Sequence, residues 1–209
     1  MNSILLALGW GILGAAAGWA VRWGSVRLAR LEELEPGSLP WQVYGPIVLS
    51  AALFAAFALR VSPLPLLALR SLFVLVLVQV IFFDFEHRLI LDRVMFPSMV
   101  LALVVSLFGN PWWAGIATGL AAGLLFLLIA LVGAAIFKAE ALGFGDVKLA
   151  LFMGLLLGPL PTVQALFYGV FLAGVVSVAL IIWRRSMKGT IAYGPYLAAG
   201  ALITLFQLP

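Results

Sequence analysis

Residues 64–83 read LPLLALRSLFVLVLVQVIFF, and this run holds a single charged residue, Arg70. About 20 apolar residues is the length that a helix needs to cross a hydrocarbon core of roughly 30 Å. The apolar residues cover every side of the expected helix, whereas a helix on the surface of a soluble domain carries them on one stripe. The run therefore predicts a transmembrane helix, which ends at Asp84.

Similar runs recur along the whole chain. The protein has 209 residues, of which 65% are hydrophobic and 10% charged, and its mean hydropathy is +1.22. These values lie far outside the range of soluble domains. We therefore predict an all-α polytopic membrane protein with about eight transmembrane helices and the N-terminus outside. The spans are expected at about 3–21, 43–59, 64–83, 94–108, 112–137, 147–160, 162–183 and 190–208, of which 94–108 and 147–160 are short.

The basic residues test this topology. Eight crossings place two of them outside, Arg60 and Arg70, and the other ten inside: Arg22, Arg27, Arg30, Arg88, Arg93, Lys138, Lys148, Arg184, Arg185 and Lys188. Such a split is a strong positive-inside signal. If 147–160 failed to cross, the split would fall to seven against five. Charge therefore favours eight crossings.

The chain is predicted to form a single membrane domain over 1–209, with a short cytoplasmic loop at 22–42. It has no cysteine and one histidine, His87, which excludes disulfides and thiolate nucleophiles and argues against a zinc site. The formal net charge of +4 is spread beside apolar spans, so lipid is the expected partner and nucleic acid is not. Glycines spaced by three or four residues, such as Gly14 and Gly18, predict close helix packing.

Only eight acidic residues occur, and outside the loop at 22–42 they fall in two short regions, 84–92 and 140–146. The topology places both regions at the cytoplasmic membrane surface. Asp84 follows two phenylalanines, where a carboxylate is partly desolvated. Asp146 follows Gly143, Phe144 and Gly145, and the two glycines are expected to allow tight backbone bends that present the carboxylate.

Two carboxyl groups within hydrogen-bond reach do not both ionise easily, so one keeps a proton while the other activates a water. This is aspartic-protease chemistry, and it needs neither metal nor cofactor. The structural alternative is that Asp84 and Asp146 merely end helices, with Asp146 capping the span that follows. For either residue alone that alternative is favoured, and their joint placement brings the two explanations level.

Three motifs resemble those of the type IV prepilin peptidase family. Residues 143–149, GFGDVKL, resemble the Gly-x-Gly-Asp signature of intramembrane aspartic proteases. Residues 83–92, FDFEHRLILD, are similar to the family's first aspartate motif, although Leu91 stands where proline is usual. Residues 193–197, YGPYL, resemble its Phe-Gly-Pro motif. The resemblance implies a peptidase core over 64–209.

It also implies that Asp84 and Asp146 are the catalytic pair, with Gly143, Gly145 and Lys148 supporting the second motif. The substrate would be a type IV prepilin, or a pseudopilin of type II secretion. It would lose a short basic leader after a glycine, at the cytoplasmic face of a prokaryotic inner membrane. Three acids are expected to attract that leader: Glu86, Asp92 and Glu140.

Bifunctional members of the family carry a long cysteine-rich loop and methylate the product with S-adenosylmethionine. The short cysteine-free loop at 22–42 therefore predicts neither methylation nor zinc. Two other functional classes stay open, a transporter with interfacial carboxylates and a noncatalytic pilus or secretion assembly factor. The Tyr-Asp and Pro-Ala-Leu companions of presenilin-like proteases are absent. His87 is expected to be an exposed loop residue rather than a proton relay.

Overall fold

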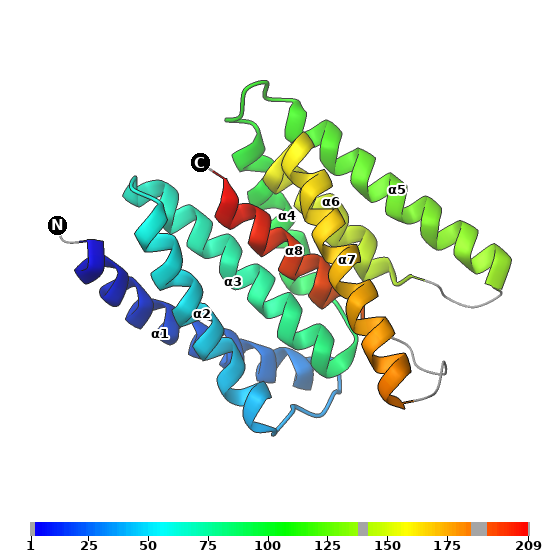
Figure 1. Ribbon diagram of the computed structural model, residues 1–209, viewed down its shortest axis with the longest axis horizontal. Helices are drawn as coiled ribbons and strands as arrows, with labels where there is room; N and C mark the ends of the chain where they lie inside the picture. Colours follow the sequence, from blue (N-terminus) through cyan, green and yellow to red (C-terminus); the bar gives the residue numbers. More distant parts are fainter. Residues whose placement is uncertain (1–2, 138–141, 185–191, 209) are drawn as a thin grey trace. The chain divides into compact units, whose positions relative to one another are not determined.

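The computed structural model describes residues 3–137, 142–184 and 192–208. Throughout these ranges the regular structure is helical, with no strand, which confirms the all-α prediction (Figure 1). The helices are α1 (Ser3–Leu31), α2 (Pro40–Arg60), α3 (Leu64–His87), α4 (Asp92–Ser106), α5 (Ala114–Phe137), α6 (Phe144–Leu157), α7 (Pro159–Arg184) and α8 (Gly194–Gln207). Each corresponds to one of the predicted spans.

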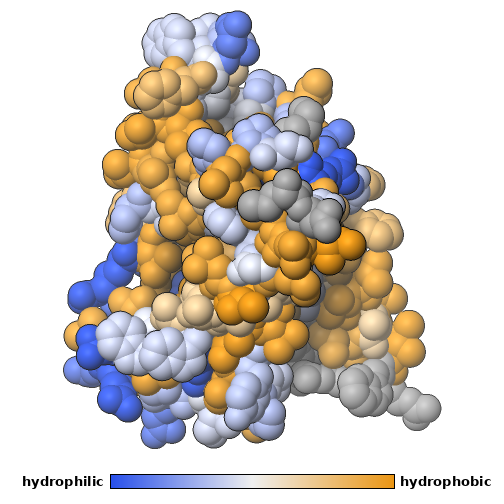
Figure 2. Space-filling model, turned by 90° about the vertical axis from the view of Figure 1, so that its left-hand side faces the viewer, coloured by the Kyte–Doolittle hydropathy of each residue, from blue (hydrophilic) through white to orange (hydrophobic). Residues whose placement is uncertain are grey.

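The helices have the apolar surface that a bilayer requires. Five of them, α1, α2, α3, α5 and α7, contain stretches long and apolar enough to cross a membrane. Large apolar side chains such as Leu120, Leu124 and Ile136 on α5 are more than half exposed, and Figure 2 shows apolar residues over much of one face. Helices α4, α6 and α8 are shorter, with 15, 14 and 14 residues. The chain is thus a polytopic membrane protein.

Helix α1 continues ten residues beyond the predicted end of its span at Val21. Its buried face keeps the same spacing across that point, through Gly18, Arg22, Ser25 and Ala29, and the Ser25 hydroxyl lies 2.8 Å from Oε1 of Gln79 on α3. The hydropathy pattern shows only where the chain becomes polar. The helix continues beyond that point because its buried face packs against α3. Much of the predicted loop at 22–42 is therefore helical.

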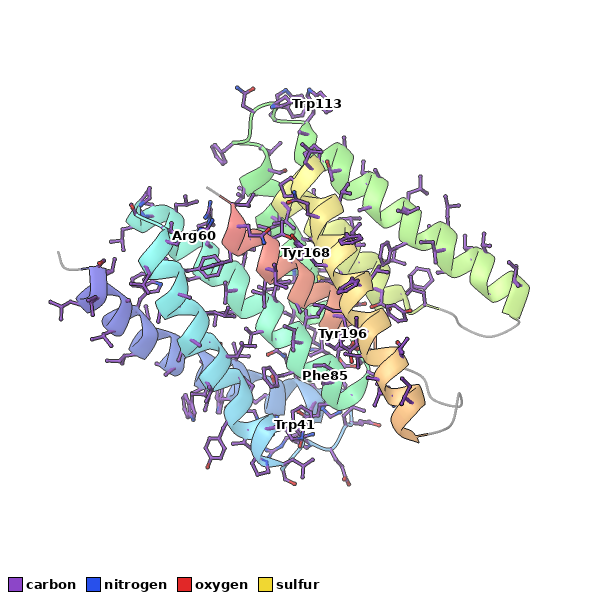
Figure 3. The ribbon with its side chains drawn as sticks, viewed as in Figure 1. Trp41, Arg60, Phe85, Trp113, Tyr168 and Tyr196 are labelled. Carbon is purple, nitrogen blue, oxygen red and sulfur yellow. The ribbon has the colours of Figure 1, made fainter. Side chains whose placement is uncertain are left out.

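The chain divides into two compact units, residues 1–88 and 89–208. In the first unit, α1 packs closely on α2 through glycines. A Cβ atom at Gly14 would lie 2.6 Å from the carbonyl oxygen of Ser50, and one at Gly18 would lie 2.6 Å from that of Pro46. This confirms the predicted close packing. The start of α2 and the end of α3 lie at the same end of this unit, as Trp41 and Phe85 in Figure 3 show.

The second unit also packs through small residues. A Cβ atom at Gly154 of α6 would lie 2.5 Å from Cα of Gly119 on α5, and one at Gly200 of α8 would meet the backbone of α7. Helix α6 ends at Leu157 and is followed by Gly158, whose φ of 75° and ψ of −173° suit glycine alone. Helix α7 begins at the next residue, Pro159. The predicted motif around Gly194 and Pro195 forms the first turn of α8.

Candidate functional site

Asp84 lies in the last turn of α3, in the first unit. The helix continues past the predicted end at Phe83 and stops after His87, because Arg88 adopts a left-handed conformation with φ of 54°. The backbone N–H of Arg88 donates to the carbonyl oxygen of Asp84 at 2.9 Å. Asp84 is 5% exposed and Phe83 is 2% exposed. The first motif thus presents its carboxylate from a buried position at a helix end.

Glu86 is held in an ion pair that the sequence did not predict. Its Oε2 lies 3.0 Å from Nη1 of Arg22 on α1, and the two side chains are 6% and 11% exposed. Its other oxygen, Oε1, accepts a hydrogen bond from the backbone N–H of Gly37. Arg22 also donates to the Gly37 carbonyl. Glu86 is therefore engaged by contacts inside the first unit.

His87 is the last residue of α3, and the prediction that it is an exposed loop residue was wrong. Its side chain is 8% exposed, with Nε2 3.3 Å from Oε1 of Glu86. Its ring packs on Phe83 with 4.6 Å between centroids. The helix extends further than hydropathy suggests, so it carries the imidazole into the packed end of the unit.

Asp146 lies in the first turn of α6, in the second unit, and is 9% exposed. This residue precedes the predicted span 147–160, and α6 is outside the five long apolar helices. Burial raises the pKa of Asp146 to about 6, although a hydrogen bond from the backbone of Gly143 acts in the opposite direction. A helix-capping role for Asp146 would explain the hydrogen bond with Gly143, but it would not explain why the Asp146 side chain is buried. The Asp146 carboxyl group is thus easier to protonate than that of an exposed aspartate.

The two glycines before Asp146 do not make the predicted tight bends. Gly143 has φ of −73° and ψ of 149°, a conformation open to any residue, and Gly158 is the one glycine with positive φ in the described part of the chain. Gly145 is required for space instead, because a Cβ atom there would lie 2.8 Å from Cβ of Ile90. The contact links the second motif to the Ile90–Asp92 segment of the first.

Lys148 pairs with Asp92 at the same end of the second unit. Its Nζ lies 2.5 Å from Oδ1 of Asp92 and 5.2 Å from the ring centroid of Phe96. Side chains two positions apart in an α-helix project in directions about 200° apart around its axis. Lys148 and Asp146 therefore point to different sides of α6. Asp92 remains half exposed. Glu140 lies outside the described residues.

An apolar groove of about 340 Å³ runs between α4, α5 and α6, lined in part by Phe96, Leu151 and Leu155. The α6 residues in this groove are about 140° and 180° around the helix from Asp146. The groove therefore does not lead to that carboxylate. Among the residues described, no three His, Asp or Glu side chains gather as a metal site would require.

These features define a polytopic helical membrane protein with one buried aspartate in each unit, each in a distinct motif. A model of the type IV leader peptidase family matches residues 71–178, which is just over half of the chain and includes Asp84 and Asp146. The chain belongs to the type IV leader peptidase family.

A curated relative supports this assignment. The chain is 30% identical over 164 residues to a prepilin leader peptidase/N-methyltransferase from Bacillus subtilis (strain 168). The match covers 75% of this chain and 62% of that relative, so the chain spans less than two thirds of the relative's length. No solved structure matches the chain.

Proposed function

We propose that this protein is an aspartic leader peptidase that hydrolyses one peptide bond of a type IV prepilin or pseudopilin. Cleavage follows the leader glycine at the cytoplasmic face of the membrane. The observation that carries the proposal is the family match over 71–178. Two of the three aspartates in that segment, Asp84 and Asp146, are buried, and each lies at the end of a helix.

The chemistry requires Asp84 and Asp146 to act on one water. One carboxyl group holds a proton and hydrogen-bonds to the carbonyl oxygen of the scissile peptide, while the ionised one accepts a proton from the attacking water. The tetrahedral intermediate then collapses as a proton moves to the leaving amine. Asp146 suits the protonated role better than an exposed aspartate would, since burial raises its pKa to about 6.

We propose that fewer acidic residues attract the basic leader than the three that the sequence suggested. Glu86 is buried against Arg22, whereas the Asp92 side chain is 54% exposed near the start of α6. The partner of Asp92, Lys148, is itself partly exposed, so Asp92 can attract a further cation without leaving a buried charge uncompensated. We assign leader attraction to Asp92 and Glu140.

Cleavage of purified prepilin by the protein in detergent tests the proposal. Asp84→Asn and Asp146→Asn are each expected to lower kcat by at least about 10³-fold, because each removes a proton-transfer group. Asp92→Asn is the matched carboxylate control and is expected to raise KM with kcat retained. Near-normal kcat in either of the first two variants refutes the catalytic pair. Tight prepilin binding without cleavage by the wild-type protein would indicate an assembly factor instead.

The B. subtilis relative is named for a second activity, N-methylation. We propose that this chain acts as a peptidase without it, since the segment between α1 and α2 is short and the chain has no cysteine. Incubating the enzyme with prepilin and labelled S-adenosylmethionine checks this. Release of an unlabelled mature pilin is expected, and label at its new N-terminus would overturn the proposal.

A further inference from the structure

Three segments of the first unit meet at the end of α3. Arg22 comes from α1, Gly37 from the segment between α1 and α2, and Glu86 from the last turn of α3. Each of the three contacts the other two: the Arg22 guanidinium donates to the Glu86 carboxylate and to the Gly37 carbonyl, and the Gly37 N–H donates to Glu86. The contacts form a closed triangle that joins residues 49 and 64 positions apart in sequence.

This triangle lies next to the first aspartate. Glu86 follows Asp84 by two residues, and the helix ends at the next residue, His87, before the left-handed Arg88. The last turn of a helix lacks part of its internal hydrogen bonding and opens readily unless other groups hold it. The triangle supplies that hold, through side chains that are 11% and 6% exposed.

The chemistry of the triangle demands arginine at position 22. A guanidinium presents several N–H groups in a fixed fork, so it can bond the carboxylate and the carbonyl together, whereas a lysine ammonium is a point charge that lacks this geometry. Loss of either charge leaves the other buried without the ion-pair partner that Arg22 and Glu86 provide for each other. The pair therefore acts as a unit rather than as two independent groups.

We propose that Arg22 and Glu86 are positioning residues that, through Gly37, fix the last turn of α3 and so the catalytic placement of Asp84. The proposal rests on the function proposed above, because it assigns a task in that reaction. In this proposal neither residue contacts the substrate. The expected signature is a fall in kcat with little change in KM, since the leader is recognised by other acids.

Five variants test the pair: Arg22→Gln, Arg22→Lys, Glu86→Gln, the double variant of Arg22→Gln with Glu86→Gln, and Arg27→Gln as control. Arg27 lies on the same helix, exposed, with its guanidinium carbon 3.9 Å from the ring centroid of Trp23. Displacement of a reacting group by about 1 Å costs on the order of 10²-fold in rate. Arg22→Gln and Glu86→Gln are expected to lower kcat by roughly 10- to 100-fold, with KM within about threefold.

Arg22→Lys is expected to recover part of kcat, and the double variant to be no worse than either single one. Arg27→Gln should match the wild type. Hydrogen exchange of the peptide covering residues 83–90 gives a readout that needs no activity. Exchange there should quicken in Arg22→Gln and Glu86→Gln, with the middle of α3 unchanged.

The possible failures are distinguishable. A wild-type enzyme that does not cleave prepilin refutes the proposed function, while the exchange data still test the anchoring. Cleavage by Arg22→Gln with wild-type kcat refutes the positioning role and leaves the peptidase intact. If Arg22→Gln does not fold, as judged by gel filtration in detergent, Arg22→Lys decides: full kcat with unchanged exchange contradicts the need for the guanidinium fork.

Discussion

Replacing Gly145 by alanine adds one methyl group where Ile90 already lies. The new Cβ atom would stand 2.8 Å from Cβ of Ile90, and 3.2 Å and 3.3 Å from its Cγ1 and Cδ1 atoms. Carbon atoms prefer separations of about 3.5–4.0 Å, so the two segments must part by roughly 1 Å. The obstacle is a Cβ atom fixed to the backbone, and rotation of the Ile90 side chain cannot relieve it.

The cost follows from that displacement. Overpacking of this kind destabilises a fold by about 1–3 kcal/mol, and a shift of about 1 Å in a catalytic group lowers a rate by on the order of 10²-fold. Gly145 immediately precedes Asp146 in the first turn of α6, so the aspartate must move with it. We expect Gly145→Ala to lower prepilin cleavage by roughly 10- to 100-fold and to reduce heat stability in detergent.

Gly143→Ala is the matched control. A Cβ atom at Gly143 has its nearest contact, Oδ2 of Asp146, at 3.5 Å, which is an ordinary separation that requires no movement of that carboxyl group, and the backbone there suits alanine. Cleavage rates of both variants, with melting followed in the same detergent, separate the two glycines. Normal activity in Gly145→Ala, or an equal loss in both variants, would refute the argument that space rather than flexibility selects Gly145. Combining Gly145→Ala with Ile90→Gly should restore part of the activity, because it removes the obstructing atom.

Two further outcomes are expected. The raised pKa of Asp146, about 6 against 3.8, means that ionisation disfavours the folded state. Asp146→Asn should therefore melt higher than the wild type above pH 6, and this advantage should shrink as the pH falls toward 4; a difference independent of pH would contradict the burial of an ionisable carboxylate. Gly18→Val should lower the melting temperature, because the new side chain would collide with the α2 backbone. Gly9→Val should leave the melting temperature unchanged, because position 9 has open space around it. Equal melting temperatures for the two variants would contradict the close contact of α1 and α2.

The helices of the described residues could be predicted because each contains an apolar run. Such runs can be recognised in the sequence without knowledge of tertiary contacts. Helix ends were less predictable. Ser25 and Ala29 belong to α1 because their side of the helix is packed, and a hydropathy pattern does not report packing. Glu33 and Arg88 adopt left-handed conformations close to helix ends. Neither glutamate nor arginine favours that conformation, so the sequence did not predict it.

The candidate site shows the same division. Asp84 and Asp146 stood out because carboxylates are rare in this chain and lie in recognisable motifs. The partner of Glu86 could not be found, since Arg22 is 64 residues away and nothing local links the two. The role of Gly145 was misread for a similar reason: its constraint comes from Ile90, which is close in space but distant in sequence.

The length of α6 has a consequence for the hydrolysis proposed above, in which water is the second substrate. Fourteen residues extend about 21 Å at 1.5 Å per residue, against a hydrocarbon core of roughly 30 Å. A helix of that length with a carboxylate in its first turn draws headgroups and solvent inward at that end. Water for the proposed reaction therefore has only a short path from the membrane surface to Asp146, whose side chain is otherwise covered by protein.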